Sequence, residues 1–271
     1  MKKLVIALTA LAAFSGSAAA ADLGARPYAK APAPVVMAPS WTGFYLFGGA
    51  GGGTWDANGG VDVTGTGACI VCTNTRTGGD GWFGTVGAGY DWQTGPAWVF
   101  GIFGDGTFGN LKGNIGDAGV FAGGASTGIV GSVKMETAWA AGARVGYLIT
   151  PNVLSYVNGG YTGTYWSGST LLGSNTGTPS GLHTDSFNTQ GWFVGGGVEN
   201  SLNFFGINSP GWFMKTEYRA SYLDSKRLNE KVDGSNVLFG RDITFKPFVQ
   251  TISTSLVYRF NWTGAPIAAK Y

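Results

Sequence analysis

Charge is scarce in this chain. Only 12% of its 271 residues are Asp, Glu, Lys or Arg, about half the share found in typical soluble domains. Only one histidine and two cysteines are present. The one long apolar run, from Leu4 to Phe14, is shorter than the roughly 20 residues that a membrane-spanning helix needs. The sequence therefore excludes a helical membrane protein.

The first residues have the organisation of a secretory signal peptide. Lys2 and Lys3 precede the apolar run, and small residues from Ser15 to Ala21 follow it, so we expect cleavage after Ala20. Loss of both lysines lowers Lys+Arg from 17 to 15, equal to the 15 Asp+Glu. The mature chain is then formally neutral, which argues against a nucleic-acid partner.

Glycine and aromatic residues are abundant instead: the chain has 48 glycines and is 14% aromatic. Low charge, many glycines and many aromatics favour short strands whose outward faces meet lipid. Before these strands, residues 21–40 contain Pro27, Pro32, Pro34 and Pro39. Such a backbone is semi-extended and enters a ladder poorly, so we interpret this stretch as a periplasmic linker.

From Trp41 onward, strand-like segments alternate with turn residues, and short connections alternate with long ones. An even-numbered membrane barrel with both ends inside has this asymmetry of short periplasmic turns and long external loops. We predict an all-β fold, an eight-stranded antiparallel transmembrane up-and-down β-barrel over 41–260, followed by a tail at 261–271. The predicted strands are 41–55, 82–92, 97–108, 133–149, 152–166, 190–204, 212–223 and 248–260.

Side chains alternate along several of these segments with period two. In 133–149, Met135 and Trp139 share one face, while Glu136 and Arg144 share the other; the facing of the first and fifth segments stays open. Aromatic residues gather at the segment ends, as expected for rings at two membrane interfaces. The predicted girdle beside the short connections holds Trp41, Tyr45, Tyr90, Trp92, Trp98, Tyr147, Tyr156, Trp212 and Tyr258, and that beside the long ones Trp55, Trp82, Trp166, Trp192 and Phe248.

Two short motifs carry a family resemblance. Residues 41–45 read Trp-Thr-Gly-Phe-Tyr, and residues 256–260 read Leu-Val-Tyr-Arg-Phe. With the signal and the Pro/Ala-rich linker, the chain resembles the alphaproteobacterial outer-membrane β-barrel family, also called outer membrane immunogenic or porin-family proteins. The resemblance covers essentially the mature chain and implies an eight-stranded barrel like the OmpA transmembrane barrel. It also implies insertion by the outer-membrane assembly machinery, for which Tyr258 and Phe260 are the candidate signal; the alternative is that the terminal Tyr271 contributes to recognition.

The interior of an eight-stranded barrel is roughly filled by its own side chains. Charges there must pair, because an isolated buried charge is very costly. We hypothesise a mixed-sign ladder that plugs the barrel; the alternative is a gated or narrow water path. The candidate lumen residues are Asp105, Glu136, Arg144, Glu199, Lys215, Glu217, Arg219 and Arg259, with Asp91 as a further candidate.

The cysteines and the histidine lie in the long connections. Cys69 and Cys72 are predicted to form a small disulfide, because the compartment is oxidising and no second ligand pair exists for a metal. His183 lies near Asp185 and Ser186 in a Gly/Ser/Thr-rich stretch, where nothing in the sequence fixes its rotamer. We therefore expect a solvated loop histidine, no enzyme activity, and no catalytic, cofactor or metal site.

The function predicted from these features is structural: an outer-membrane protein that contributes to envelope integrity and presents its loops at the surface. The alternatives are a small-solute diffusion porin and a loop-mediated adhesin or ligand-binding protein. Expected partners are outer-membrane lipid, lipopolysaccharide and the barrel assembly machinery. The expected location is the outer membrane of a Gram-negative bacterium, and the oligomeric state stays open.

Overall fold

A computed structural model describes residues 40–117, 128–207 and 209–260, without the side chains of 70–75 and 117. The predicted signal peptide, linker and tail lie outside the described residues, apart from Ser40. The strands are β1 (Gly43–Val63), β2 (Cys69–Thr94), β3 (Trp98–Asp117), β4 (Ile129–Thr150), β5 (Val153–Trp166), β6 (Ser169–Gly173), β7 (Pro179–Thr184), β8 (Phe187–Ser201), β9 (Trp212–Leu223), β10 (Lys226–Val232) and β11 (Leu238–Arg259). Within these ranges the only helical element is the 3₁₀ turn η1 (Leu202–Phe205), and no helix is long and apolar enough to cross a membrane.

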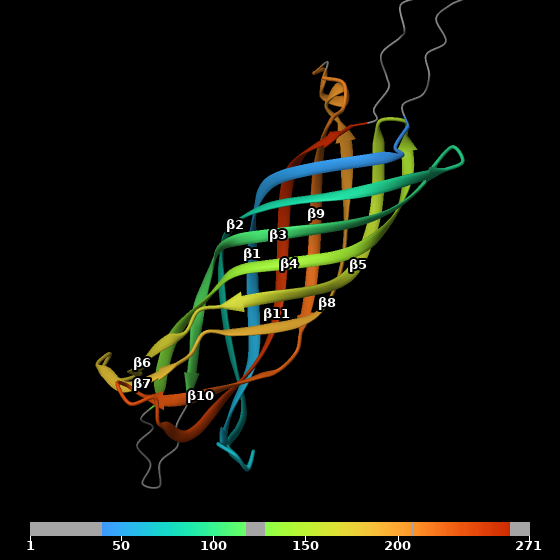
Figure 1. Cartoon of the computed structure of the whole chain (residues 1–271). Coiled ribbons are helices and arrows are strands. Elements are labelled where there is room, and N and C mark those ends of the chain that lie inside the picture. The colour runs from blue at the N-terminus through green and yellow to red at the C-terminus, as the bar shows by residue number, and fades with distance from the viewer. Residues whose placement is uncertain (1–39, 118–127, 208, 261–271) are drawn as a thin grey trace, which may run out of the picture. The chain divides into compact units, whose positions relative to one another are not determined.

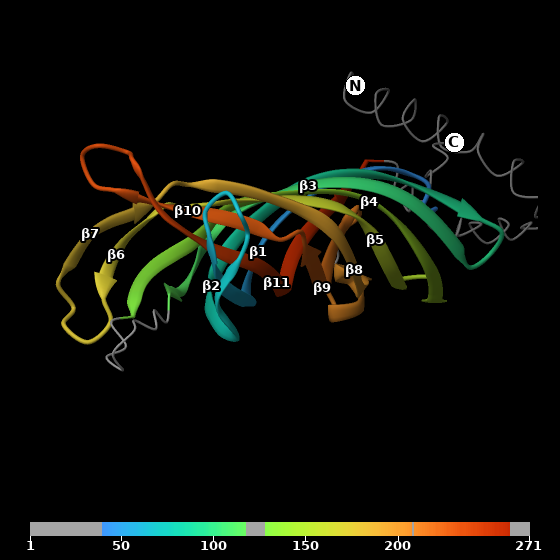
Figure 2. The ribbon, with the colours of Figure 1, turned by 90° about the horizontal axis from the view of Figure 1, so that it is seen from below.

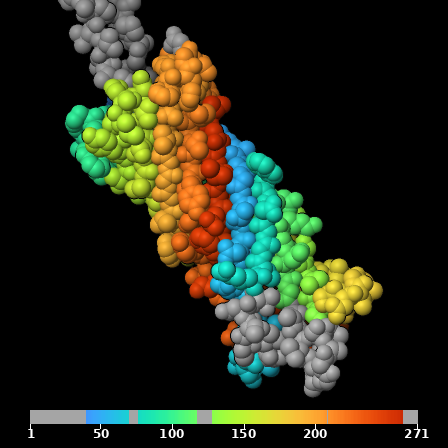
Figure 3. All heavy atoms as spheres, turned by 180° about the vertical axis from the view of Figure 1, so that it is seen from behind, coloured from blue at the N-terminus to red at the C-terminus, as the bar shows by residue number. Residues whose placement is uncertain are grey.

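Eight of the strands form a closed antiparallel ring, as predicted. The order is β1-β2-β3-β4-β5-β8-β9-β11, and pairing of β1 with β11 closes it. That last ladder runs without interruption from Tyr45 opposite Arg259 to Val63 opposite Arg241, and Figure 3 shows β11 directly beside β1. Closure removes the free sheet edges that would otherwise invite aggregation.

The strands extend further than the sequence suggested. We predicted long loops beyond residues 55, 108, 166 and 223, but β1 to β4 and β11 continue through most of these stretches, and β6, β7 and β10 continue the wall above β5, β8 and β9. These three short strands pair in the order β4–β6–β7–β10–β11, and they gather at one end of the barrel (Figures 1 and 2). We call this the outer end, and the end with the short turns the inner end.

Aromatic residues on the outward face mark a band of constant width. On β2, β3, β9 and β11, two outward aromatics lie ten residues apart: Trp82 and Trp92, Trp98 and Phe108, Trp212 and Tyr222, Phe248 and Tyr258. Ten residues at about 3.4 Å each, tilted by about 45°, span roughly 24 Å along the barrel axis. This matches the apolar band of about 25 Å on outer-membrane barrels.

Five aromatics that we predicted in the girdles lie inside the barrel instead. Trp41, Tyr45 and Tyr156 are buried in an inner apolar cluster, and Trp55 and Trp166 in an outer one. Facing glycines leave room for such rings: a Cβ added at Gly89 would lie 2.3 Å from the Tyr45 hydroxyl. In a narrow barrel, glycines on one strand leave space that large aromatic side chains from neighbouring strands fill.

Candidate functional site: the barrel interior

Four buried charges form a cluster just inside the inner end. They are Asp91 on β2, Arg144 on β4, Glu199 on β8 and Arg259 on β11, each at most 3% exposed. Arg144 donates to Asp91 (3.0 Å from Nε) and to Glu199 (3.1 Å from Nη1), and Arg259 donates to Glu199 (2.9 Å from Nε). Arg259 Nη2 also lies 2.8 Å from Asp91 Oδ2. Two carboxylates and two guanidinium groups thus neutralise one another across four strands.

Aromatic rings enclose this four-charge cluster. The Arg144 guanidinium lies 4.5 Å from the Tyr45 ring centroid, and that of Arg259 lies 4.4 Å from the Trp41 ring. At these distances the rings attract the cations as well as filling space. Trp41 is held across the inner end: its indole N–H donates to Pro151 O, its backbone N–H to Gln93 Oε1, and its carbonyl accepts from Arg259.

A second charged cluster lies further along the interior. Arg219 forms two hydrogen bonds to Asp105, at 3.0 and 2.8 Å, and another of 2.8 Å to Glu217. Glu217 also accepts from the Tyr156 hydroxyl at 2.7 Å, and Lys215 Nζ lies 3.8 Å from it. Two acids and two bases again balance, so neither cluster leaves a net charge in the lumen.

Beyond the charges the lumen becomes first polar and then apolar. A cavity of about 40 Å³ is lined by hydroxyl groups such as Thr85, Thr162 and Ser253, together with Asp105 and Arg219; it has room for a few water molecules. Toward the outer end, aromatic rings pack across the interior. Ring centroids of Trp55 and Trp166 are 5.3 Å apart, and Phe245 contacts Trp55, Trp166 and Phe187 at 5.5, 5.1 and 5.4 Å.

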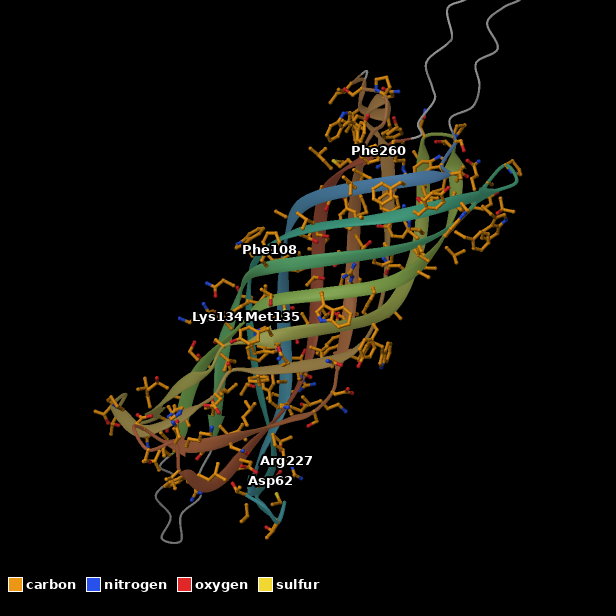
Figure 4. The ribbon with its side chains drawn as sticks, viewed as in Figure 1. Asp62, Phe108, Lys134, Met135, Arg227 and Phe260 are labelled. Carbon is orange, nitrogen blue, oxygen red and sulfur yellow. The ribbon has the colours of Figure 1, made fainter. Side chains whose placement is uncertain are left out.

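The structure places seven of the eight candidate lumen residues in these two clusters, together with Asp91. The prediction for Glu136 was wrong, because it forms a half-exposed pair with Lys134 at 2.8 Å. The register of β4 against β5 slips between Met135 and Thr137, and a bulge of this kind puts the alternation of the residues before it out of phase with the alternation after it. Met135 therefore points inward and Lys134 does not (Figure 4).

The remaining predicted residues lie apart from the lumen. Cys69 begins β2, but the side chain of Cys72 lies outside the described residues, so the disulfide stays a prediction. Tyr258 and Phe260 are exposed at the inner end of the last strand, and their rings are 5.0 Å apart. His183 is not a free loop residue: it lies on β7 and its Nδ1 is 2.7 Å from Asp233 Oδ1.

Sequence reasoning missed the aromatic members of the interior. Tyr45, Tyr156 and Trp41 were assigned to the girdles because their positions near strand ends suit either role. The signal that could have placed Tyr156 inside is its parity with Asn158 on β5, since Asn158 is buried too. No group of three or more His, Cys, Asp or Glu residues in the described part of the chain is arranged to hold a metal.

No family model matches the chain. It is 31% identical over 273 residues to the 31 kDa outer-membrane immunogenic protein of Brucella melitensis, and equally to that of Brucella suis. Each alignment covers 96% of this chain and all of the relative. The chain belongs to this family of outer-membrane immunogenic proteins. Among solved structures, OprG of Pseudomonas aeruginosa is similar with a TM-score of 0.49 and 9% identity, over 80% of this chain and 97% of that one. Because the chain belongs to a family of outer-membrane proteins, the closed ring of eight strands is an outer-membrane β-barrel.

Proposed function

We propose that this outer-membrane barrel is a closed structural protein of the envelope that presents its outer end at the cell surface. The observation that carries the proposal is the filled interior, where four acidic and four basic side chains pair in two clusters. A solute or ion would have to break these buried pairs, and separating one costs about 3–5 kcal/mol. In the outer half of the interior, the packed aromatic side chains of Trp55, Trp166, Phe187 and Phe245 fill the lumen.

A planar-bilayer recording tests this proposal against the alternative of a diffusion porin. We expect pure, folded protein to give no steady unitary conductance, while a known porin in the same bilayer gives regular steps. Regular steps that scale with the amount of this protein would contradict the closed barrel and favour the porin.

The surface role is supported by the outer extension and by the name of the Brucella relatives, which calls them immunogenic. β6, β7 and β10 are paired strands that extend the barrel wall beyond the outer girdle. The turns that follow β6 and β10, at 174–178 and 233–236, are therefore held in place by strands. Replacing the turns at 174–178 and 233–236 by Gly/Ser linkers should leave insertion intact and abolish recognition by antibodies raised against whole cells. Unchanged recognition would place the exposed epitopes elsewhere.

Binding of a ligand or host surface by this outer extension is the second candidate function. The end of the β10–β11 connection and the start of β11 expose Val237, Leu238 and Phe239, which are 60%, 48% and 46% exposed. Exposed apolar groups in a row favour contact with a partner. Serine at all three positions would abolish adhesion to cells or matrix if this segment binds, whereas a purely structural protein would show no change.

We further propose export by a cleaved signal peptide, insertion by the barrel assembly machinery, and contact of the lipid-facing band with lipopolysaccharide. An enzymatic role is not part of the proposal. Within the described residues, the hydrogen bond of His183 goes to Asp233, and no serine, threonine or cysteine donates to its ring.

A further inference from the structure

The connection between β8 and β9 differs from the other turns at the inner end. The turns at 95–97 and 151–152 hold glycine, proline and small or polar residues. The β8–β9 connection instead contains η1 and exposes three large apolar side chains: Phe204, Phe205 and Ile207 are 62%, 47% and 52% exposed. We call residues 202–207 the apolar turn.

The apolar turn is a built element. The Ser201 hydroxyl accepts from Asn203 N at its start, and Gly206 ends it in the left-handed region at φ 79°, with its N–H directed to Asn203 O. These caps satisfy backbone groups that a loose loop would leave to water. The Phe204 and Phe205 rings meet edge to face at 5.3 Å. The side chains are therefore presented together.

The position of the apolar turn at the inner end of the ring indicates which part of the membrane contacts it. The chain leaves the ring at Ser201, opposite Phe213, and returns at Trp212 of the inner girdle. Four residues of 3₁₀ helix rise about 8 Å. The headgroup layer on each side of the hydrocarbon core is about 5–8 Å thick. Phe204 and Phe205 therefore lie within about 8 Å of the end of the ring, a span that the headgroup layer covers, and this layer favours aromatic rings.

We propose that the apolar turn is an interfacial anchor that inserts Phe204, Phe205 and Ile207 into the inner phospholipid surface of the outer membrane. It leads into β9, whose first residue Trp212 pairs with Tyr258 of β11, and the rings of Trp212, Tyr258 and Phe260 are also exposed at this end. Insertion removes three apolar side chains from water at the same end as these girdle residues. The anchor fixes the depth of the barrel on the side of β8 and β9, independently of whether the lumen conducts.

Depth measurement by electron paramagnetic resonance tests the anchor. A nitroxide is attached to Ile207→Cys, in a Cys69→Ser/Cys72→Ser chain reconstituted into phosphatidylethanolamine/phosphatidylglycerol vesicles. Thr94→Cys, at the end of β2 beside the polar turn at 95–97, is the matched control at the same end of the barrel. We expect the ratio of oxygen to nickel-chelate accessibility at 207 to exceed that at 94 several-fold. Phe204→Ser/Phe205→Ser should lower the ratio at 207 to the control level.

Two outcomes would overturn the proposal. Equal ratios at 207 and 94 would mean that the apolar turn stands in water. Low accessibility to both reagents at 207 would mean that protein covers it, either residues of this chain outside the described ranges or a second copy. Folding of each variant is checked by its migration on an unheated gel, so that loss of insertion is not confused with loss of anchoring.

Discussion

Arg144 is the side chain on which the inner charged cluster depends. It bridges Asp91 and Glu199 and lies against Tyr45 and Tyr156. Arg144→Ala would leave both carboxylates with Arg259 alone. We expect the free energy of unfolding to fall by about 3–5 kcal/mol, measured by urea denaturation in vesicles. Lys134→Ala, which removes only the half-exposed pair with Glu136, should change it little; equal losses would contradict a special role for the buried cluster.

Gly101 shows how tightly this cluster is enclosed. A Cβ at this position would lie 2.0 Å from Asp91 Oδ1, and Asp91 cannot move away without breaking its bonds to the two arginines. We expect Gly101→Ala to destabilise the barrel by about 1–3 kcal/mol. Gly106→Ala on the same strand is the control, because its Cβ would meet nothing within 4 Å. Urea midpoints that shift equally for both variants would mean that strand propensity, and not the clash, sets the cost.

At the residue scale, the sequence predicted which charges lie inside wherever alternation was regular. Lys215, Glu217 and Arg219 share a parity on β9 with no interruption, and all three point inward. Glu136 failed because the facing after a bulge depends on pairing with the next strand, which no single segment encodes. Which arginine meets which carboxylate also depends on register between strands far apart in sequence, so the pairs themselves were not predictable.

At the element scale, the β6–β7 hairpin is joined to the rest of the outer wall by two short seams, one with β4 and one with β10. The seam between β7 and β10 is the one that side chains reinforce. Its ladder contains only His183 opposite Lys231 and Leu182 opposite Val232. Side chains reinforce it: Lys231 pairs with Asp185, and His183 with Asp233. Such exposed pairs contribute little individually, but here they support a ladder of two positions. The β6–β7 hairpin is therefore the part of the wall that opens most easily.

Lys231→Ala should loosen this seam. Without its partner, Asp185 no longer ties the end of β7 to β10, and we expect faster amide exchange at Leu182 and His183. Asn229→Ala serves as the control, since Asn229 lies on β10 outside the β7 ladder. Hydrogen exchange followed by mass spectrometry of peptides 179–184 measures the change. Equal exchange in both variants would show that the two-residue ladder suffices.

The outer strands also show where sequence patterning stops being informative. Outward residues within the lipid band must be apolar, and that requirement made the eight segments visible. Above the band both faces tolerate Gly, Ser, Thr and Asn, while the antiparallel ladder needs only backbone groups. Residues 56–63 and 109–117 therefore pair as strands although their composition predicted loops.

At the scale of the whole molecule, the first and last strands of the described barrel meet where the ring closes. Phe260 N donates to Phe44 O at 3.1 Å, and the Phe44 and Phe260 rings are 5.6 Å apart. The described wall is complete at this point, because every strand of the ring has two neighbours. Closure was predictable from the motifs near Trp41 and Phe260, since both lie at the same end of an even-numbered barrel.

Removal of residues 261–271 should therefore leave assembly intact. Tyr258, which points outward near the end of β11, and Phe260, which directly follows the strand, are both exposed at the inner girdle, and we propose that they form the assembly signal. We expect a chain that ends at Phe260 to reach the folded, heat-modifiable form in cells as efficiently as the full chain. If folding falls instead, the tail and not Phe260 carries the signal.

Substitution of the two aromatics separates recognition from stability. Tyr258→Ala/Phe260→Ala should reduce the folded fraction in cells while the same protein, refolded in detergent, keeps most of its stability, because both rings lie on the lipid face outside the charged interior. Thr254→Ala, also outward on β11, is the matched control and should fold normally in both settings. An equal loss of folded protein in cells and in detergent would mean that the two aromatic side chains stabilise the closed barrel and are not an assembly signal.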